Sequence, residues 1–278
     1  LLPLCEICSA QHDGMSDIYT FHAGKSPLLI TVPHDGLMLA PGMVERMTPE
    51  GRALPDTDWH VAQLYDFARE LGASMLVAKF SRYVVDLNRP ASDEALYPGQ
   101  LATGLCPEQT FAGDDIYEGE GVDAAEQAER SATYWRPCHE RISATLDALR
   151  ERFGYALLWD AHSIPSQVPR LFEGELPALN IGTFGGRSCA AAFEEAVAAV
   201  AAASPYSHVV NGRFQGGFIT REYGRPVEHV HAVQLEIAQR VYMDELATTF
   251  DTQKASQLRD TLRLTLETFI KVAERDYA

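Results

Sequence analysis

Short apolar runs alternate along the chain with segments of helical periodicity. Leu28–Val32, Ser74–Ala78 and Tyr155–Trp159 have the length and apolar content of buried strands. Further strands are predicted at 83–87, 179–183, 209–210 and 232–237. Several of these runs are apolar at consecutive positions, which is typical of strands covered on both faces.

Four segments repeat their apolar residues at helical spacing: 59–71, 124 to about 152, 188–203 and 255–273. The first is followed by Gly72, a residue type that often ends helices, and Pro137 interrupts the second. Strands separated by helices predict an α/β fold with helices on both faces of a sheet. We expect residues 1–278 to form a single domain, with residues 1–20 as an irregular N-terminal extension.

The segment Tyr97–Gly121 is rich in glycine and aromatic residues and lacks periodicity. Irregular segments of this length are usually functional loops, so it is a candidate lid.

The composition narrows the function classes. The chain has 278 residues, 46% of them apolar, and a net charge of −16, which excludes a disordered polyelectrolyte and argues against a nucleic-acid binder. We find no run long enough to span a membrane and no signal peptide. Five scattered cysteines indicate reduced thiols and a cytoplasmic location, and the isolated Cys5–Cys8 pair is given no role. Because the chain as a whole is negatively charged, binding of an anionic substrate requires a local cluster of arginines.

Two histidines directly follow predicted strands: His34 after Leu28–Val32, and His162 after Tyr155–Trp159. Ligands of open α/β sheets bind beyond the carboxyl ends of the strands. Two imidazoles and one carboxylate, with a water in the remaining position, are a common ligand set of hydrolytic zinc sites. A histidine chosen at random is more often a core or capping residue, but the shared position of these two favours a metal site.

The third ligand is less well determined, because position 37, three residues after His34, is a leucine. The nearest acids are Asp58, Asp56 and Asp35, which we rank in that order. Asp58 would alternatively be the N-cap of the helix expected at 59–71.

Arg82 and Arg89 flank Asn88, and together they are suited to bind a carboxylate. The alternative is a pair of surface arginines bound to Asp86 and Glu94.

A second basic set, Arg213 and Arg221, surrounds Gly216 and Gly217 and resembles a substrate loop. A β-hairpin with solvated arginines is the alternative, and which arginine contacts a substrate carboxylate is open. Glu236 stands within an apolar strand, where a charge is costly unless it is paired or functional. Beside a metal it would transfer the proton of a hydrolytic water.

Several motifs together resemble the N-formylglutamate amidohydrolase family. They are Ser81–Pro90, Leu96–Gln100, Asp160–Ser163, Asn211–Arg221 and His231–Glu236. The resemblance runs from about Pro27 to the C-terminal helix. It implies a zinc-carboxypeptidase-like fold: a mixed, mostly parallel sheet flanked by helices.

The resemblance also implies roles for individual residues. The imidazoles of His34 and His162 would bind zinc. Zinc carboxypeptidases and their relatives carry a glutamate ligand three residues after the first histidine, and Asp58 would replace that glutamate here. Arg82 would polarise the scissile carbonyl, and Glu236 would be the general base.

Asn88 and Arg89 would hold a carboxylate of the substrate. The implied reaction is hydrolysis of N-formyl-L-glutamate, a small dicarboxylate, to formate and L-glutamate in histidine degradation. The alternatives are a deacylase for another N-acyl amino acid, a carboxypeptidase-like enzyme and a metal-free binding protein for acidic amino acids.

Overall fold

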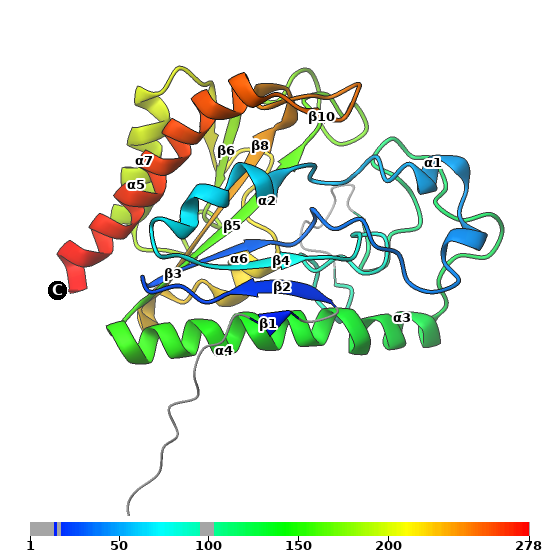
Figure 1. The fold of residues 1–278 in the computed structure, drawn as a ribbon, viewed down its shortest axis with the longest axis horizontal. Helices are drawn as coiled ribbons and strands as arrows, with labels where there is room; N and C mark the ends of the chain where they lie inside the picture. The colour runs from blue at the N-terminus through cyan, green and yellow to red at the C-terminus, as the bar shows by residue number, and fades with distance from the viewer. Residues whose placement is uncertain (1–13, 16–17, 95–102, 278) are drawn as a thin grey trace, which may run out of the picture.

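One mixed sheet forms the centre of the molecule (Figure 1). The structure is a computed structural model that describes residues 14–15, 18–94 and 103–277. Within them the sheet has eight strands in the order β1-β2-β4-β3-β5-β8-β6-β7. The strands are β1 (Gly14–Met15), β2 (Tyr19–His22), β3 (Leu28–Val32), β4 (Ser74–Ala78), β5 (Ala156–Ile164), β6 (Leu179–Gly182), β7 (His208–Val210) and β8 (Val230–Ala238). β9 (Met243–Asp244) and β10 (Thr249–Phe250) form a separate pair.

The four central strands, β4, β3, β5 and β8, are parallel to one another. β2 and β6 run antiparallel to their inner neighbours at the two sides of this group. The prediction of a mixed, mostly parallel sheet is therefore confirmed.

Helices cover both faces of the sheet (Figure 1). The α-helices are α1 (Pro49–Arg52), α2 (Val61–Leu64), α3 (Ala124–Arg130), α4 (Arg136–Phe153), α5 (Ala191–Ala203), α6 (Phe218–Tyr223) and α7 (Thr252–Tyr277). Single turns of 3-10 helix occur at Val44–Arg46, Asp66–Arg69, Pro226–Glu228 and Gln239–Val241. α4 and α6 lie on one face, and α2, α5 and α7 lie on the other. None of the helices in the described part of the chain is long and apolar enough to cross a membrane.

The period-two alternation of β5 builds both cores. Leu157 and Trp159 pack against α5 and α7, whereas Ala156 and Leu158 pack against α4. All of these side chains are fully buried, and a buried leucine stabilises the fold by about 1.5–3 kcal/mol relative to an exposed one.

Two expectations about local structure are wrong. The predicted strand at 83–87 is a series of buried turns. The backbone amide of Asn88, just after this segment, donates to Asp86 Oδ1. Its apolar residues indicated burial, but the segment contributes no strand to the sheet. The helix expected at 59–71 divides into α2 and the 3-10 turn at Asp66–Arg69, and ends before Gly72, whose φ is +70°.

Other expectations concern segments that the structure describes only in part. Of the extension at 1–20, residues 1–13 and 16–17 lie outside the described residues, as does the Cys5–Cys8 pair, but β1 and the start of β2 are regular strands. Residues 95–102 are also not described, and residues 103–121 are irregular, as expected. The lid and the single domain remain predictions.

β5 and β8 extend further than predicted, and this lengthening positions the functional residues. Asp160 and His162 lie within β5, and not beyond its end. The register pairs Asp160 with Gln234 and His162 with Glu236. Because paired residues share a face, these four polar side chains lie on the face that carries α4 and α6, beyond its apolar part.

Candidate active site

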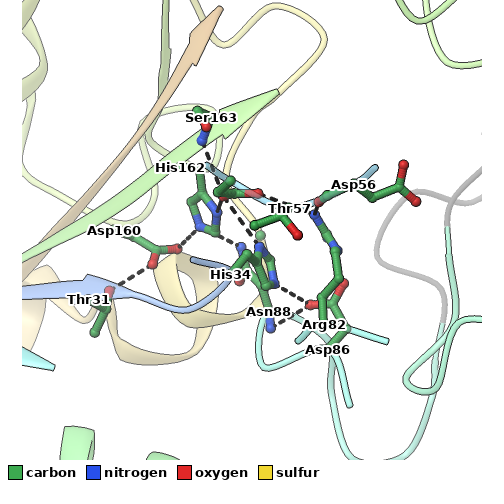
Figure 2. Close-up of polar contacts among 12 residues, drawn as sticks. Thr31, His34, Asp56, Thr57, Arg82, Asp86, Asn88, Asp160, His162 and Ser163 are labelled. Carbon is green, nitrogen blue, oxygen red and sulfur yellow. Dashed lines mark hydrogen bonds and ion pairs between the residues drawn. The ribbon is translucent and has the colours of Figure 1, made fainter. Parts of the chain in front are cut away.

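His34, Asp58 and His162 converge on one point. Figure 2 shows the imidazoles of His34 and His162 close together near the carboxyl ends of β3 and β5. One potential ligand atom from each residue lies within 4.8 Å of the other two. The two imidazole ring centroids are 5.0 Å apart, and all three residues are at most 2% exposed. The structure thus brings together the two predicted imidazoles and the first-ranked carboxylate.

His34 lies in the loop after β3, and Asp58 lies in the loop before α2. A backbone contact joins these two loops, because the Asp58 amide donates to the His34 carbonyl at 3.1 Å. The alternative role of Asp58 as helix N-cap is wrong, because Asp35 Oδ2 instead accepts the amide of Ala62 in α2. Asp56 turns away from the imidazoles (Figure 2). Its carboxylate accepts the Tyr83 hydroxyl and the Phe111 amide.

Each imidazole is backed by a second carboxylate. His34 Nε2 donates to Asp86 Oδ1 at 2.8 Å, and His162 Nε2 lies 3.0 Å from Asp160 Oδ2. This pairing leaves the Nδ1 lone pair of each ring available for a metal, as in many metal sites. Thr31 in β3 holds Asp160 through a 2.7 Å hydrogen bond. Sequence reasoning considered Asp86 only as a partner of surface arginines and assigned no role to Asp160, although Asp160 alternates with His162 on one strand face.

The two Nδ1 atoms face the same oxygen, Asp58 Oδ2, at 3.6 Å from His34 and 3.0 Å from His162. His34 Nδ1 is buried and has no hydrogen-bond partner. Two ring nitrogens and a carboxylate oxygen can converge at such distances when a proton or a metal ion lies between them. The residues present therefore fit a divalent metal ion, and their donor types are those of a zinc site.

Strong electrostatic coupling holds this cluster in its charged form. Burial alone would raise the pKa of Asp58, but the two imidazoles lower it below its ordinary value. Burial would likewise lower the pKa of His162, but Asp160 and Asp58 raise it well above the usual value. A cation, whether a proton or a metal ion, is thus favoured between these groups.

Arg82 lies beside the cluster and is 7% exposed. One terminal nitrogen, Nη2, binds Asp86 Oδ2 at 2.8 Å, and the other, Nη1, lies 3.5 Å from Asp58 Oδ1. Its Nε is buried without a hydrogen-bond partner. The alternative prediction paired the arginines with Asp86 at the surface. Arg82 does pair with Asp86, but both side chains are buried in the site.

Glu236 projects from β8 into the same cavity. Burial raises the pKa of its carboxyl to about 8, although His162 lowers it. A carboxyl group in such surroundings can accept and hold a proton near neutral pH, which is the property required of a proton shuttle.

Asn88 and Arg89 also line the cavity, together with Arg213, Thr103 and Gln234. Asn88 Nδ2 lies 3.0 Å from His162 Nε2, and Asn88 Oδ1 accepts the backbone amide of Ile219 in the first turn of α6. Gly217 permits this approach, since a Cβ there would lie 2.2 Å from Asn88 Nδ2.

The two arginines of the second basic set are placed differently. Arg213 lines the cavity and donates from Nε to the Leu171 carbonyl. Arg221 does not line it; its Nε donates to the Gly216 carbonyl and its guanidinium lies 4.5 Å from the centre of the Phe184 ring. The cavity therefore gathers three arginines, Arg82, Arg89 and Arg213, and not Arg221.

Comparison with known proteins agrees with this geometry. The family model for N-formylglutamate amidohydrolase matches residues 26–243. An N-formylglutamate deformylase of Pseudomonas putida is 52% identical over 233 residues, which are 83% of this chain and 87% of that protein. An N-formylglutamate deformylase of Pseudomonas aeruginosa is 50% identical over 267 residues, covering 95% of this chain and 100% of that protein.

A solved structure shares the fold. The crystal structure of an N-formylglutamate amidohydrolase from Ralstonia eutropha superposes with a TM-score of 0.80 at 24% sequence identity, covering 93% of this chain and 99% of that one. Since the family model matches well over half of the sequence and the Pseudomonas proteins are at least 50% identical to it, this chain belongs to the N-formylglutamate amidohydrolase family.

Proposed function

We propose that this chain is a metal-dependent amidohydrolase that cleaves N-formyl-L-glutamate to formate and L-glutamate. The observation that carries the proposal is the buried cluster of His34, Asp58 and His162, set in a cavity that three arginines also line. The names of the Pseudomonas relatives support the substrate. In this role the enzyme would release glutamate at the end of histidine degradation, and its cytoplasmic location stays a prediction.

His34, Asp58 and His162 would hold one divalent ion, and zinc suits their two imidazoles and one carboxylate. When bound, such an ion lowers the pKa of water and polarises a carbonyl group. Asp86 and Asp160 would orient the two imidazoles. Asp86 accepts from Nε2 of His34, and Asp160 faces Nε2 of His162, so that Nδ1 of each ring would bind the metal.

The chain itself would supply the remaining chemistry. Glu236 would take a proton from the attacking water and pass it to the departing nitrogen, so that the amine leaves as a neutral group. Arg82 would donate hydrogen bonds to the oxygen of the formyl group as negative charge develops on it. Its buried, unpartnered Nε–H shows that this arginine retains donor capacity.

Arg89 and Arg213 would bind the two carboxylates of the substrate. Arg89 is held in place by Thr103, whose carbonyl accepts from Nε at 2.8 Å. The net charge of −16 would repel a dianion, so these local positive charges must provide the attraction. Asn88 completes the wall between Arg89 and His162.

The decisive experiment combines metal analysis with formate release from N-formyl-L-glutamate. We expect about one divalent ion per chain, loss of activity on chelation, and recovery when zinc is restored. Glu236→Gln should lower kcat by about 10²–10⁴-fold while the metal content stays unchanged.

Asp244 is an exposed carboxylate in β9 that does not line the cavity, so Asp244→Asn is the matched control and should retain activity. Full activity after complete chelation would contradict metal dependence. A chain that binds N-formylglutamate without hydrolysing it would instead be a binding protein.

A further inference from the structure

Phe111 separates the active-site cavity from an apolar pocket beside it. Among the described residues it alone lines both spaces. The neighbouring pocket is lined mostly by apolar side chains: Pro55, Ala112, Pro165, Val168 and Pro169. We expect removal of the Phe111 ring to join the two spaces.

The Phe111 ring is fixed from two directions. Its centre lies 4.8 Å from the guanidinium carbon of Arg82, a distance typical of a cation–π contact. Its backbone amide donates to Asp56 Oδ2 at 2.8 Å, and that oxygen also accepts the Tyr83 hydroxyl at 2.7 Å. Asp56 is 4% exposed. The ring is thus a buried part of the cavity wall, 8% exposed, and not a surface side chain.

This wall stands beside the group that would bind the acyl oxygen. A carbonyl bond of about 1.2 Å and a hydrogen bond of about 2.9 Å would place the acyl carbon within roughly 4 Å of an Arg82 nitrogen. A formyl carbon carries only hydrogen at its remaining position. An acetyl or longer acyl group carries further carbon atoms there, and these come within reach of the Phe111 ring, whose centre is 4.8 Å from the Arg82 guanidinium carbon.

We propose that Phe111 determines acyl-group specificity: its ring fills the space that any acyl group larger than formyl would require. This inference rests on the proposed function, because it assumes that Arg82 binds the acyl oxygen. It further predicts that the apolar pocket behind the ring can accept a longer acyl chain once the ring is removed.

The test measures kcat/KM for N-formyl-, N-acetyl- and N-butyryl-L-glutamate with the metal-loaded enzyme. We expect the wild type to prefer formyl over acetyl by about 100-fold. Phe111→Ala keeps the backbone amide that binds Asp56, and should reduce this preference at least about tenfold, mainly by raising kcat/KM for the longer substrates. Phe111→Leu, which leaves a smaller opening, should give an intermediate preference.

Phe172→Ala is the matched control, because Phe172 packs in the same apolar cluster as Phe111 but lines neither space. It should leave the acyl preference unchanged. The inference is overturned if Phe111→Ala and Phe111→Leu retain the wild-type preference, or if Phe172→Ala changes it equally. If Phe111→Ala does not fold, the Leu variant decides alone. A wild type that prefers acetyl, or hydrolyses none of the three, would overturn the proposed function as well, so the two failures are distinguishable.

Discussion

At the scale of single residues, the site depends on the pairing of each functional group with a second buried group. His34 is oriented by Asp86, and Asp86 also binds Arg82. One carboxylate thus connects a proposed metal ligand to the proposed oxyanion-binding arginine. Although burial raises the pKa of Asp86, His34 and Arg82 lower it well below its usual value. The carboxylate is therefore charged at any pH at which the enzyme would operate.

The two arginines of the second basic set allow a direct comparison. Arg213→Met should raise KM for N-formyl-L-glutamate roughly 10- to 100-fold, because a charged hydrogen bond to a substrate carboxylate is lost. Arg221→Met should change KM less than about threefold, because Arg221 does not line the cavity. Steady-state kinetics of both variants check this. An equal rise in KM for both would show that Arg221 also contacts the substrate.

At the scale of elements, the helical segment α3–α4 holds the loop around Asn88, which we propose binds the substrate, from outside the cavity. α3 and α4 are joined by a π-helical turn at Ser131–Trp135, and Pro137 is the second residue of α4. A proline removes one backbone donor, and the wider turn accommodates that loss without ending the helix. The predicted interruption at Pro137 is therefore a local change of helix type, and the helical segment continues to Phe153.

Trp135 in this turn and His139 in α4 place two ring donors against the loop that carries Asn88. Trp135 Nε1 donates to the Arg89 carbonyl and His139 Nε2 to the Leu87 carbonyl, each at 2.9 Å. The two rings are stacked, with centroids 3.8 Å apart. The loop is thereby held on both sides of Asn88.

Trp135→Phe keeps an aromatic ring but removes the donor to Arg89. Loss of one such hydrogen bond costs about 1 kcal/mol, so we expect KM to rise roughly fivefold while kcat changes little. Tyr134→Phe, in the same turn, packs on Phe80 through its ring and is the control. A fall in kcat without a change in KM would argue against this positioning role.

At the scale of the whole molecule, acid stability should depend on a buried histidine on α4. His139 is 5% exposed, and burial lowers its pKa from 6.5 to about 4, although the Leu87 carbonyl acts in the opposite sense. Between these two values the unfolded chain binds a proton that the folded chain does not. The free energy of unfolding therefore falls as pH drops from about 6.5 to 4.

Two and a half pKa units correspond to roughly 3 kcal/mol. Urea unfolding of the wild type and of His139→Gln at pH 7.5, 6 and 5 measures this contribution. Because both proteins keep the same metal-site groups, the difference between them isolates His139. The wild type should lose more stability on acidification than the variant. Parallel losses would show that His139 does not contribute.

Part of the fold and site could be read from the sequence because it rests on local patterns. Apolar runs and helical periodicity identified β3, β4 and α7 closely, since burial and repeat length are properties of neighbouring residues. His34 and His162 were identified by their positions after apolar runs. The buried segment 83–87 was misread as a strand, because apolar composition reports burial and does not report whether a partner strand exists.

The sequence by itself determined the α/β architecture, singled out the two imidazoles that the structure brings together, and indicated that an acidic chain needs local arginines to attract an anion. Only the tertiary structure decided which carboxylate joins the imidazoles and which arginine of the second set lines the cavity. It also gave Asp56, Asp86 and Phe111 their places around Arg82. These choices depend on contacts between residues far apart in the chain, which only the packing of strands, loops and helices brings together.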